Sequence, residues 1–533
     1  MTARVLHDLR GTHKIKRRET RAVKEFIAKH ASRINGVVSS FDRIMFKGYL
    51  PICSGESMES FMDFRRWLRK DFKRHVSQAS ETLKRHVWNL AQRAGRRYVP
   101  LQRSVRKEDL ARRIASEDGV TQGLVCVMTA VEGCQSFRMI PGKDRPRIVS
   151  AARKCLCVYV YFIDRELGFM HVRLQTWFPF TIQVCVNGHE ALARSMTRHK
   201  IGYQQVDNCF VAIDNCRRAQ RLADNLARRD WPRLLSALAR RVNPLMGGLL
   251  GAMDYYWVTQ QAEYSTDVMF RRPEDLAGLY EGLLRHATLC FSPEDVMIFL
   301  GYKGLHGNFA GAAGAHAKRR WPGARVRHDI KGNVIKMYNK HGSVLRIETV
   351  INNPYEFKVY REGRRKGRRV LGWYPMAKRV GNLRRYAEVS LAANGRYLAA
   401  LSAVEDPSQA ITQIQQIARP ARKAKRSYRG FNPADENDVR LFQTVLRGEH
   451  AVRGLRNADI RQRLFRAANG PERRRLDSAR VSRLLKRLHV HGLIAKIPRS
   501  RRWRVTKKGQ MLMGGIVMVH HELYPQAVLA RAA

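Results

Sequence analysis

Positive charge constrains this chain more than any other feature of its sequence. Lys and Arg number 100 and Asp and Glu number 45, which gives a formal net charge of +55 at pH 7. Self-repulsion on this scale destabilises a compact fold unless counter-charge is supplied. A phosphate backbone supplies it, and the release of condensed counterions adds to the driving force for binding. The composition therefore predicts nucleic acid as the partner, either structured RNA, DNA or both.

Three alternative origins of the charge stay open. They are a structural role like that of a ribosomal protein, binding to a membrane surface, and a high-GC genome that favours Arg codons. No acidic domain or tail offsets the basic residues, and this even distribution favours nucleic acid. The sequence leaves the oligomeric state open, a homo-oligomer included.

The chain is long and apolar enough to build several cores. Its 533 residues with 44% hydrophobic content predict about three or four domains. No apolar run approaches the roughly 18 to 20 residues that cross a bilayer, and residues 1–21 are basic without a following apolar stretch. We therefore expect a cytoplasmic protein that does not enter the membrane. The nine cysteines form no Cys-x-x-Cys pair, which predicts buried thiols rather than a zinc site.

Periodicity predicts a multidomain α/β (α+β) fold. Strand-like runs cover residues 36–50, 124–131, 156–163, 170–175 and 180–186, and helical spacing covers 56–76 and 80–94. From these patterns we expect six consecutive regions: a basic N-terminal arm (1–30), a mixed-sheet α/β domain (31–187), a helical region (188–309), a basic strand-rich region with a following helix (310–417), a basic linker (418–432) and a winged-helix domain (433–533).

The strand-rich region carries a basic β-hairpin. Turn residues separate alternating strands at 334–340 and 344–350. A basic β surface with an interleaved Tyr suits contact with a nucleic-acid backbone and stacking of bases. An internal Arg346–Glu348 ion pair is the alternative interpretation. The candidate nucleic-acid-binding residues here are Lys331, Lys336, Tyr338, Lys340 and Arg346.

The C-terminal region resembles a winged helix. Three predicted helices at 433–448, 458–468 and 478–488 precede a basic hairpin, and Thr506-Lys507-Lys508-Gly509 follows it. This order is similar to the DNA-binding domain of MarR-type regulators, which implies a recognition helix in the major groove and a wing on adjacent phosphates. Protein contacts or recognition of RNA shape are the alternatives. The candidate contact residues are Arg480, Arg483, Lys486 and Arg487 on the helix and Arg499, Arg501, Arg502 and Arg504 on the wing.

The chain as a whole also resembles an uncharacterised family of bacterial proteins. The phrases that carry this likeness read SFDR at 40–43, QTWFPF at 175–180, DNCF at 207–210 and DYYW at 254–257. The resemblance implies a bacterial origin associated with mobile elements and implies no particular activity.

Acidic residues beside apolar runs are candidates for catalysis. Cleavage of a polynucleotide with divalent metals needs several converging carboxylates, because hard cations prefer oxygen ligands. Asp42 lies inside a strand-like run, as the first carboxylate of an RNase H-like nuclease does, and Glu132 ends another run. Ordinary ion pairs and turn caps are the alternative for each residue. The candidate catalytic residues are Asp42, Glu132, Asp254, Glu263 and Asp267, with the last three expected on a helix; Asp42 and Glu132 are the candidate metal ligands, and Mg²⁺ is the expected cofactor if the chain is a nuclease.

Three functions follow from these patterns. The first is a ribonucleoprotein or mobile-element protein that holds nucleic acid through several basic modules. The second is a metal-dependent nuclease or transposase-like enzyme, and the third is a winged-helix transcriptional regulator. The sequence does not decide whether the chain is an enzyme.

Overall fold

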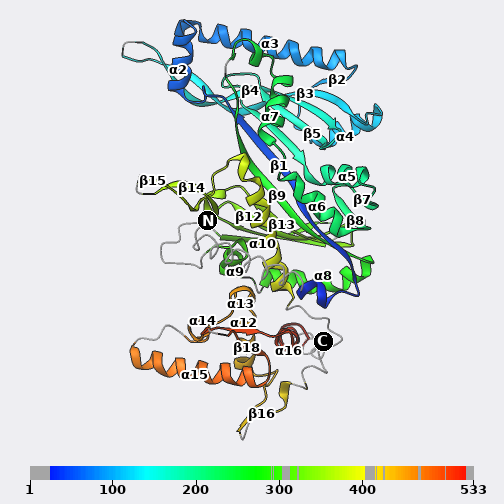
Figure 1. Cartoon of the computed structure of the whole chain (residues 1–533), viewed down its shortest axis with the longest axis vertical. Coiled ribbons are helices and arrows are strands. Elements are labelled where there is room, and N and C mark those ends of the chain that lie inside the picture. Colours follow the sequence, from blue (N-terminus) through cyan, green and yellow to red (C-terminus); the bar gives the residue numbers. More distant parts are fainter. Residues whose placement is uncertain are drawn as a thin grey trace, which may run out of the picture. The chain divides into compact units, whose positions relative to one another are not determined.

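The structure is a computed structural model of the chain (Figure 1). It describes residues 25–143, 145–251, 253–289, 291, 293–302, 313–320, 323–365, 367–402, 415, 417–423, 426–465, 470–498 and 500–523. Most of the predicted N-terminal arm and the wing residue Arg499 lie outside these ranges. Among the described residues, no helix is both long and apolar enough to cross a bilayer.

An eleven-stranded mixed sheet organises the fold. Its strand order is β10-β11-β12-β13-β9-β1-β6-β5-β4-β3-β2. β2 and β3 pair in parallel, whereas β3, β4, β5, β6 and β1 follow one another in antiparallel pairs. The strands are β1 (Ile34–Tyr49), β2 (Arg97–Pro100), β3 (Gly123–Ile140), β4 (Arg147–Asp164), β5 (Gly168–Gln175), β6 (Ile182–Asn187), β9 (Tyr256–Phe270), β10 (Ala313–Arg320), β11 (Gly323–Ile330), β12 (Asn333–Lys340) and β13 (Val344–Ile351).

The chain divides into two compact units, each assembled from distant segments. One unit contains residues 1–37, 265–349 and 389–533, and the other contains 38–264 and 350–388. Strands β1, β9 and β13 contribute residues to both units. The multidomain α+β class is therefore confirmed, with units that are discontinuous in sequence.

Helices cover the part of the sheet formed by β2 to β5. Helix α3 (Phe72–Arg93) packs on β2 and β3, and α2 (Gly55–Phe64) packs on β4. The single helix expected over 56–76 is divided, because the chain turns back at Arg66, which has a φ of +57°. Buried Arg69 then pairs with Glu59 and Asp63 of α2, so the turn is held by ion pairs. The other described helices before residue 402 are α4 (Lys107–Glu117), α5 (Gly188–Arg198), α6 (Cys216–Leu226), α7 (Trp231–Val242), α8 (Pro273–Leu289), α9 (Pro293–Leu300) and α10 (Leu383–Leu401). The 3-10 turns of this part are η1 (Arg69–Asp71), η2 (Pro244–Gly247), η3 (Pro354–Glu356) and η4 (Val380–Asn382).

The structure confirms a strand over most of 36–50 and corrects several other sequence-based expectations. Residues 36–50 form most of one long strand, β1, whose central residues are buried as in a sheet covered on both faces. The region expected to be helical, 188–309, also contains strands β7 (Tyr203–Val206), β8 (Cys209–Ile213) and β9. The expected linker contains a short hairpin, β16 (Ala421–Lys423) and β17 (Arg426–Tyr428). A further hairpin, β14 (Lys358–Arg365) and β15 (Arg368–Pro375), follows η3.

The C-terminal segment contains helices followed by a short hairpin. Its core is built from buried apolar side chains such as Phe442, Leu485 and Ile516. Helix α15 begins before and ends after the predicted range 478–488, and Gly492, whose φ is +74°, follows its end. The elements are α12 (Glu436–Leu446), α13 (Gly448–Arg453), α14 (Asn457–Leu464), α15 (Pro471–Val490), β18 (Ile494–Lys496), β19 (Trp503–Val505), α16 (Lys507–Met518) and the π-helical turn η6 (Val519–Leu523).

The Thr-x-x-Gly run joins α16 to this hairpin. The Thr506 hydroxyl accepts a hydrogen bond from the Gly509 amide at 2.9 Å and donates one to the Gly492 carbonyl at 2.6 Å. A Cβ atom at Gly509 would lie 1.9 Å from the Leu493 carbonyl oxygen. Helix α16 therefore begins where only Gly leaves room for the neighbouring backbone.

Gly509→Ala tests this close approach. We expect it to lower the free energy of unfolding by about 1–3 kcal/mol, because the added methyl group forces backbone to move. Thermal unfolding followed by circular dichroism measures the effect. Gly278→Ala in α8 is the control, since its Cβ would meet nothing within 4 Å. Equal stability of the two variants would contradict the packing argument.

Candidate metal centre

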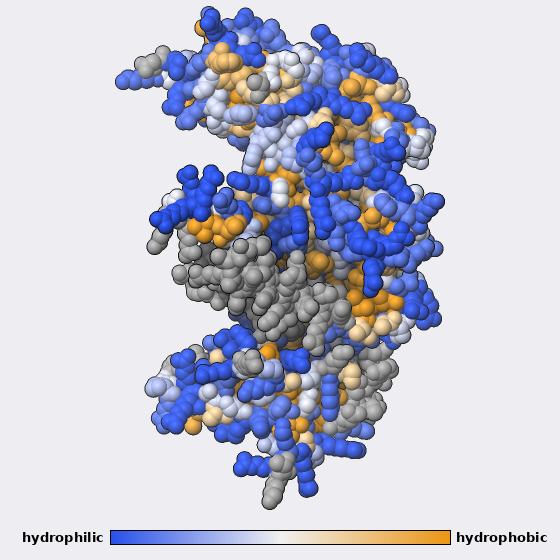
Figure 2. Space-filling model, viewed as in Figure 1, coloured by the Kyte–Doolittle hydropathy of each residue, from blue (hydrophilic) through white to orange (hydrophobic). Residues whose placement is uncertain are grey.

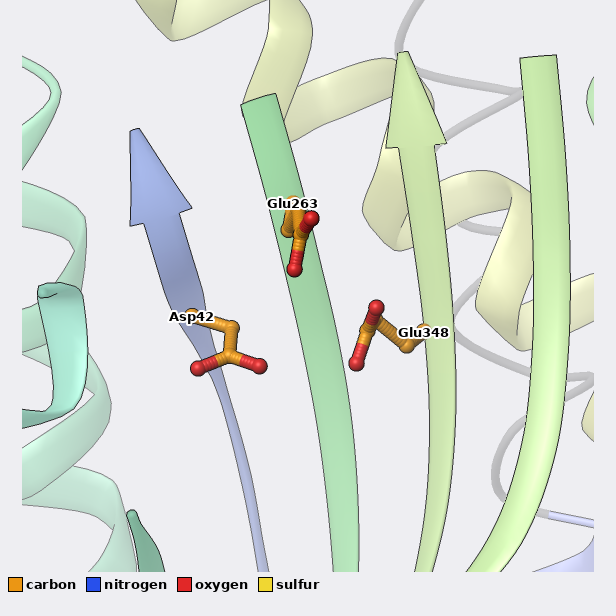
Figure 3. Close-up of side chains that lie close together, drawn as sticks. All are labelled: Asp42, Glu263 and Glu348. Carbon is orange, nitrogen blue, oxygen red and sulfur yellow. The ribbon is translucent and has the colours of Figure 1, made fainter. Parts of the chain in front are cut away.

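Three carboxylates converge on neighbouring strands of the large sheet. Asp42 lies on β1, Glu263 on β9 and Glu348 on β13, and these strands are adjacent in the order β13-β9-β1. One carboxylate oxygen from each residue lies within 4.8 Å of the other two. Figure 3 shows the three side chains directed toward one another from their strands.

Sheet geometry explains the convergence. Neighbouring strands lie about 4.8 Å apart, so side chains on one face at matching positions meet. Asp42 and Glu348 are buried and Glu263 is half-buried. Three carboxylates at this spacing repel one another strongly in a partly dry environment, and the surrounding groups must offset that repulsion.

The Asp42 carboxylate is positioned by two polar side chains. Asn187 caps helix α5 by accepting hydrogen bonds from the amides of the first turn. Gly188 lets this helix approach β1, since a Cβ there would lie 2.0 Å from the Phe41 carbonyl oxygen. As a result, Nδ1 of fully buried His189 lies 3.3 Å from Oδ1 of Asp42, and the Asn208 amide donates a hydrogen bond to the same oxygen.

The Glu348 carboxylate is held from the neighbouring strand β12. Lys336 Nζ lies 2.5 Å from Oε1, and the Tyr338 hydroxyl donates to Oε2 at 2.5 Å. The ammonium group therefore offsets one of the three negative charges. This ammonium group is also a fixed cation beside the carboxylate cluster.

A second acidic residue on β9 has a different role. Asp267 forms a bidentate ion pair with Arg346, with both N–O distances at 2.7 Å and both side chains 0% exposed. Side chains four residues apart share one face of a strand, as do those two apart. The Asp267–Arg346 pair therefore lies along the same face as Glu263 and Glu348.

The arrangement has the donor chemistry of a hard divalent cation site. Carboxylate oxygens are the ligands that Mg²⁺ and Mn²⁺ prefer, and a small number of them suffices because these ions retain water. Asp42, Glu263 and Glu348 would hold the cation. Outer-shell groups would orient two of these ligands, as they do in other metal sites. Asp42 is oriented by His189 and Asn208, and Glu348 is oriented by Lys336 and Tyr338.

Two of the five candidate catalytic residues meet here. Asp42 and Glu263 belong to the cluster, although Glu263 and Asp267 lie on strand β9 rather than on the expected helix. Glu348 completes the cluster and is absent from the sequence-based candidates. Its signal was the same as that of Asp42, a carboxylate inside an apolar strand-like run.

Glu132 and Asp254 take part in ion pairs elsewhere. Glu132 lies within hydrogen-bond distance of Tyr159, Arg173 and Lys107. Partial burial alone would raise the pKa of the Glu132 carboxyl, but these hydrogen bonds lower it below its usual value. Asp254 is largely exposed and pairs with Arg240 at 2.9 Å. Glu132, a candidate metal ligand, is therefore not among the carboxylates that converge with Asp42.

The predicted basic surface of the 334–350 hairpin is only partly exposed. Arg346 cannot contact nucleic acid because it is fully buried on Asp267, and Tyr338 is 6% exposed, which excludes stacking of bases on its ring. Lys336 is 15% exposed and bound to Glu348. Lys331 is half-buried in the turn before β12, and Lys340 is half-buried at the end of that strand. Lys336 and Tyr338 instead contact Glu348 of the carboxylate cluster.

The candidate residues of the C-terminal segment divide into two groups. Arg487 is structural, since its guanidinium binds Asp438 at 2.9 Å and stacks on Phe431. Arg502 is half-buried and donates to the Gly454 carbonyl at 3.3 Å. The exposed candidates are Arg480, Arg483, Lys486, Arg501 and Arg504.

The chain was also compared with known proteins. No family model, no curated protein and no solved structure matches it.

Proposed function

We propose that this chain binds nucleic acid and, with a divalent metal at Asp42, Glu263 and Glu348, cleaves or transfers a phosphodiester bond. The convergence of three carboxylates in a chain of net charge +55 carries this proposal. Most of the surplus charge attracts phosphate, whereas the cluster concentrates negative charge at one place. A divalent cation bound to the cluster would allow a phosphate group to approach the three carboxylates.

The residues around the cluster have distinct roles in this proposal. A divalent cation would supply Lewis-acid stabilisation of the charge that develops on the phosphate. Asn208 and His189 keep the Asp42 carboxylate in place, and Tyr338 fixes Glu348. The Lys336 ammonium adds a fixed positive charge beside the cluster, where it can stabilise the transition state.

Exposed arginines support binding of nucleic acid by the C-terminal segment. Arg480, Arg483 and Lys486 lie exposed on α15, and Arg501 and Arg504 lie at the following hairpin. A winged helix would use the same two elements. In this proposal the segment positions RNA or DNA, as expected of a ribonucleoprotein, a mobile-element protein or a regulator in the cytoplasm.

Metal-dependent cleavage by the purified chain tests the proposal. Supercoiled plasmid, single-stranded DNA and a structured RNA are incubated with Mg²⁺ or Mn²⁺, with EDTA in parallel. Calorimetric titration with Mn²⁺ measures metal binding separately. We expect metal binding and EDTA-sensitive cleavage of at least one substrate. Metal binding without cleavage would reduce the centre to a structural one, and absence of both would overturn the enzymatic proposal.

Sequencing of co-purified nucleic acid distinguishes the remaining functions. A single abundant structured RNA would favour a ribonucleoprotein. Sequence-selective binding of duplex DNA without cleavage would favour a regulator.

A further inference from the structure

The β14–β15 hairpin presents an exposed basic ribbon outside the carboxylate cluster. Most of its described residues are exposed. Arg364, Arg368 and Arg369 lie exposed near its turn, whereas Glu362 is its one acidic residue. In Figure 2 a strongly hydrophilic tip lies next to a hydrophobic patch at the place where Figure 1 labels β14 and β15.

One face of this ribbon carries two exposed aromatic rings. Tyr360 and Trp373 are directly opposite each other in the register, so their side chains share a face. Their ring centroids lie 5.6 Å apart, and the residues are 40% and 41% exposed. Leu371, on the same face and 62% exposed, extends the patch toward the arginines.

On the other face, one aromatic ring packs against the hairpin itself. The Tyr374 ring lies over Gly363, since a Cβ at that Gly would be 2.5 Å from the ring. The Tyr374 hydroxyl lies 2.9 Å from the Val370 carbonyl, and the Arg361 guanidinium lies 5.0 Å from the ring centre. Tyr374 therefore holds the ribbon together, whereas Tyr360 and Trp373 keep exposed ring surface.

A cation fixes the orientation of Trp373. The Arg385 guanidinium lies 5.2 Å from its ring centre. Arg385 is itself held by the Lys358 carbonyl at 2.8 Å and by Glu388 at 3.2 Å. The ring is thus positioned by neighbours while part of its surface stays open to solvent.

We propose that hairpin β14–β15 binds a single-stranded segment of nucleic acid. Unpaired bases stack on Tyr360 and Trp373, and the phosphates contact Arg364, Arg368 and Arg369. Exposed aromatic rings beside arginines are the combination that single strands require, because a duplex hides the faces of its bases. The inference rests on the proposed binding of nucleic acid, and it adds which surface binds and that the bound nucleic acid is single-stranded.

Binding measurements on the full chain test the proposal. Fluorescence anisotropy is measured with a labelled 20-nucleotide single strand and with the matching duplex over a range of salt concentrations. The ring variant carries Tyr360→Leu and Trp373→Leu. We expect it to bind the single strand about 10- to 100-fold more weakly, with a smaller change for the duplex. Trp373→Phe keeps a ring and should retain most of the affinity.

The charge variant tests the tip. Arg364→Gln, Arg368→Gln and Arg369→Gln together should weaken binding and lower the salt dependence by about 0.7 per lost phosphate contact. Arg422→Gln, Lys423→Gln and Arg426→Gln together, in the exposed basic hairpin β16–β17, are the matched control, because they remove the same number of positive charges. This control should change single-strand affinity less than the tip variant does.

The outcomes separate the two proposals. Wild-type binding that the ring and tip variants leave unchanged would overturn the hairpin proposal alone. Equal weakening of single-strand and duplex binding by the ring variant would also overturn it. A wild-type chain that binds no nucleic acid would overturn both. Unchanged circular dichroism of the variants shows that any loss of affinity arises at the surface.

Discussion

Asp42→Asn is expected to lower the rate of metal-dependent cleavage by about 10³-fold or more, because removal of a charged ligand loses several kcal/mol of transition-state stabilisation. The substitution keeps the size of the side chain and its contacts with Asn208 and His189. Nucleic-acid affinity should stay close to that of the wild-type chain, since the proposed contact surfaces lie elsewhere. Single-turnover cleavage and Mn²⁺ titration measure the two effects separately.

Asp254→Asn is the matched control for this prediction. Asp254 is also a carboxylate, but it is exposed and paired with Arg240 outside the cluster. We expect its cleavage rate to equal that of the wild type. Cleavage by Asp42→Asn at the wild-type rate would exclude the cluster as the catalytic centre.

Arg346→Met is expected to lower the stability of the fold by about 3–5 kcal/mol, because it leaves the Asp267 carboxylate buried without its cation. The pair is bidentate and both side chains are 0% exposed, so water cannot replace the guanidinium without rearrangement. Urea unfolding, followed by tryptophan fluorescence and circular dichroism, measures the change.

A double variant separates this cause from simple loss of packing. Adding Asp267→Leu to Arg346→Met removes the stranded charge and should restore much of the lost stability. If the double variant were as unstable as the single one, the loss would arise from packing rather than from the unpaired carboxylate.

Local patterns predicted much of the fold correctly. The apolar runs of β3 to β6 and the stripe of Val481, Leu485 and Leu488 on α15 form the expected strands and helix. In contrast, β9 lies within the region 188–309 that the sequence predicts to be helical. Residues four apart, such as Glu263 and Asp267, share one face both in a helix and in a strand. Their spacing therefore does not distinguish a helix from a strand.

The candidate site was only half predicted. Asp42 and Glu263 stood out because acidic residues are scarce beside apolar runs. The sequence suggests Glu348 only as the partner of Arg346 in the alternative interpretation of the hairpin, since the two residues share one face of a strand. In the structure Arg346 binds Asp267 and Glu348 binds Lys336. Both partners lie on neighbouring strands, where side chains on one face come into contact although they are far apart in the sequence.

The sequence by itself determined the charge of this protein and hence its expected attraction to phosphate, because net charge does not depend on the fold. It also determined most of the local elements, since apolar spacing and turn residues act over short distances. Only the tertiary structure decided which carboxylates meet and which cations are buried on them. The order of strands in the sheet sets these contacts, and that order brings β1, β9 and β13 together from distant parts of the chain.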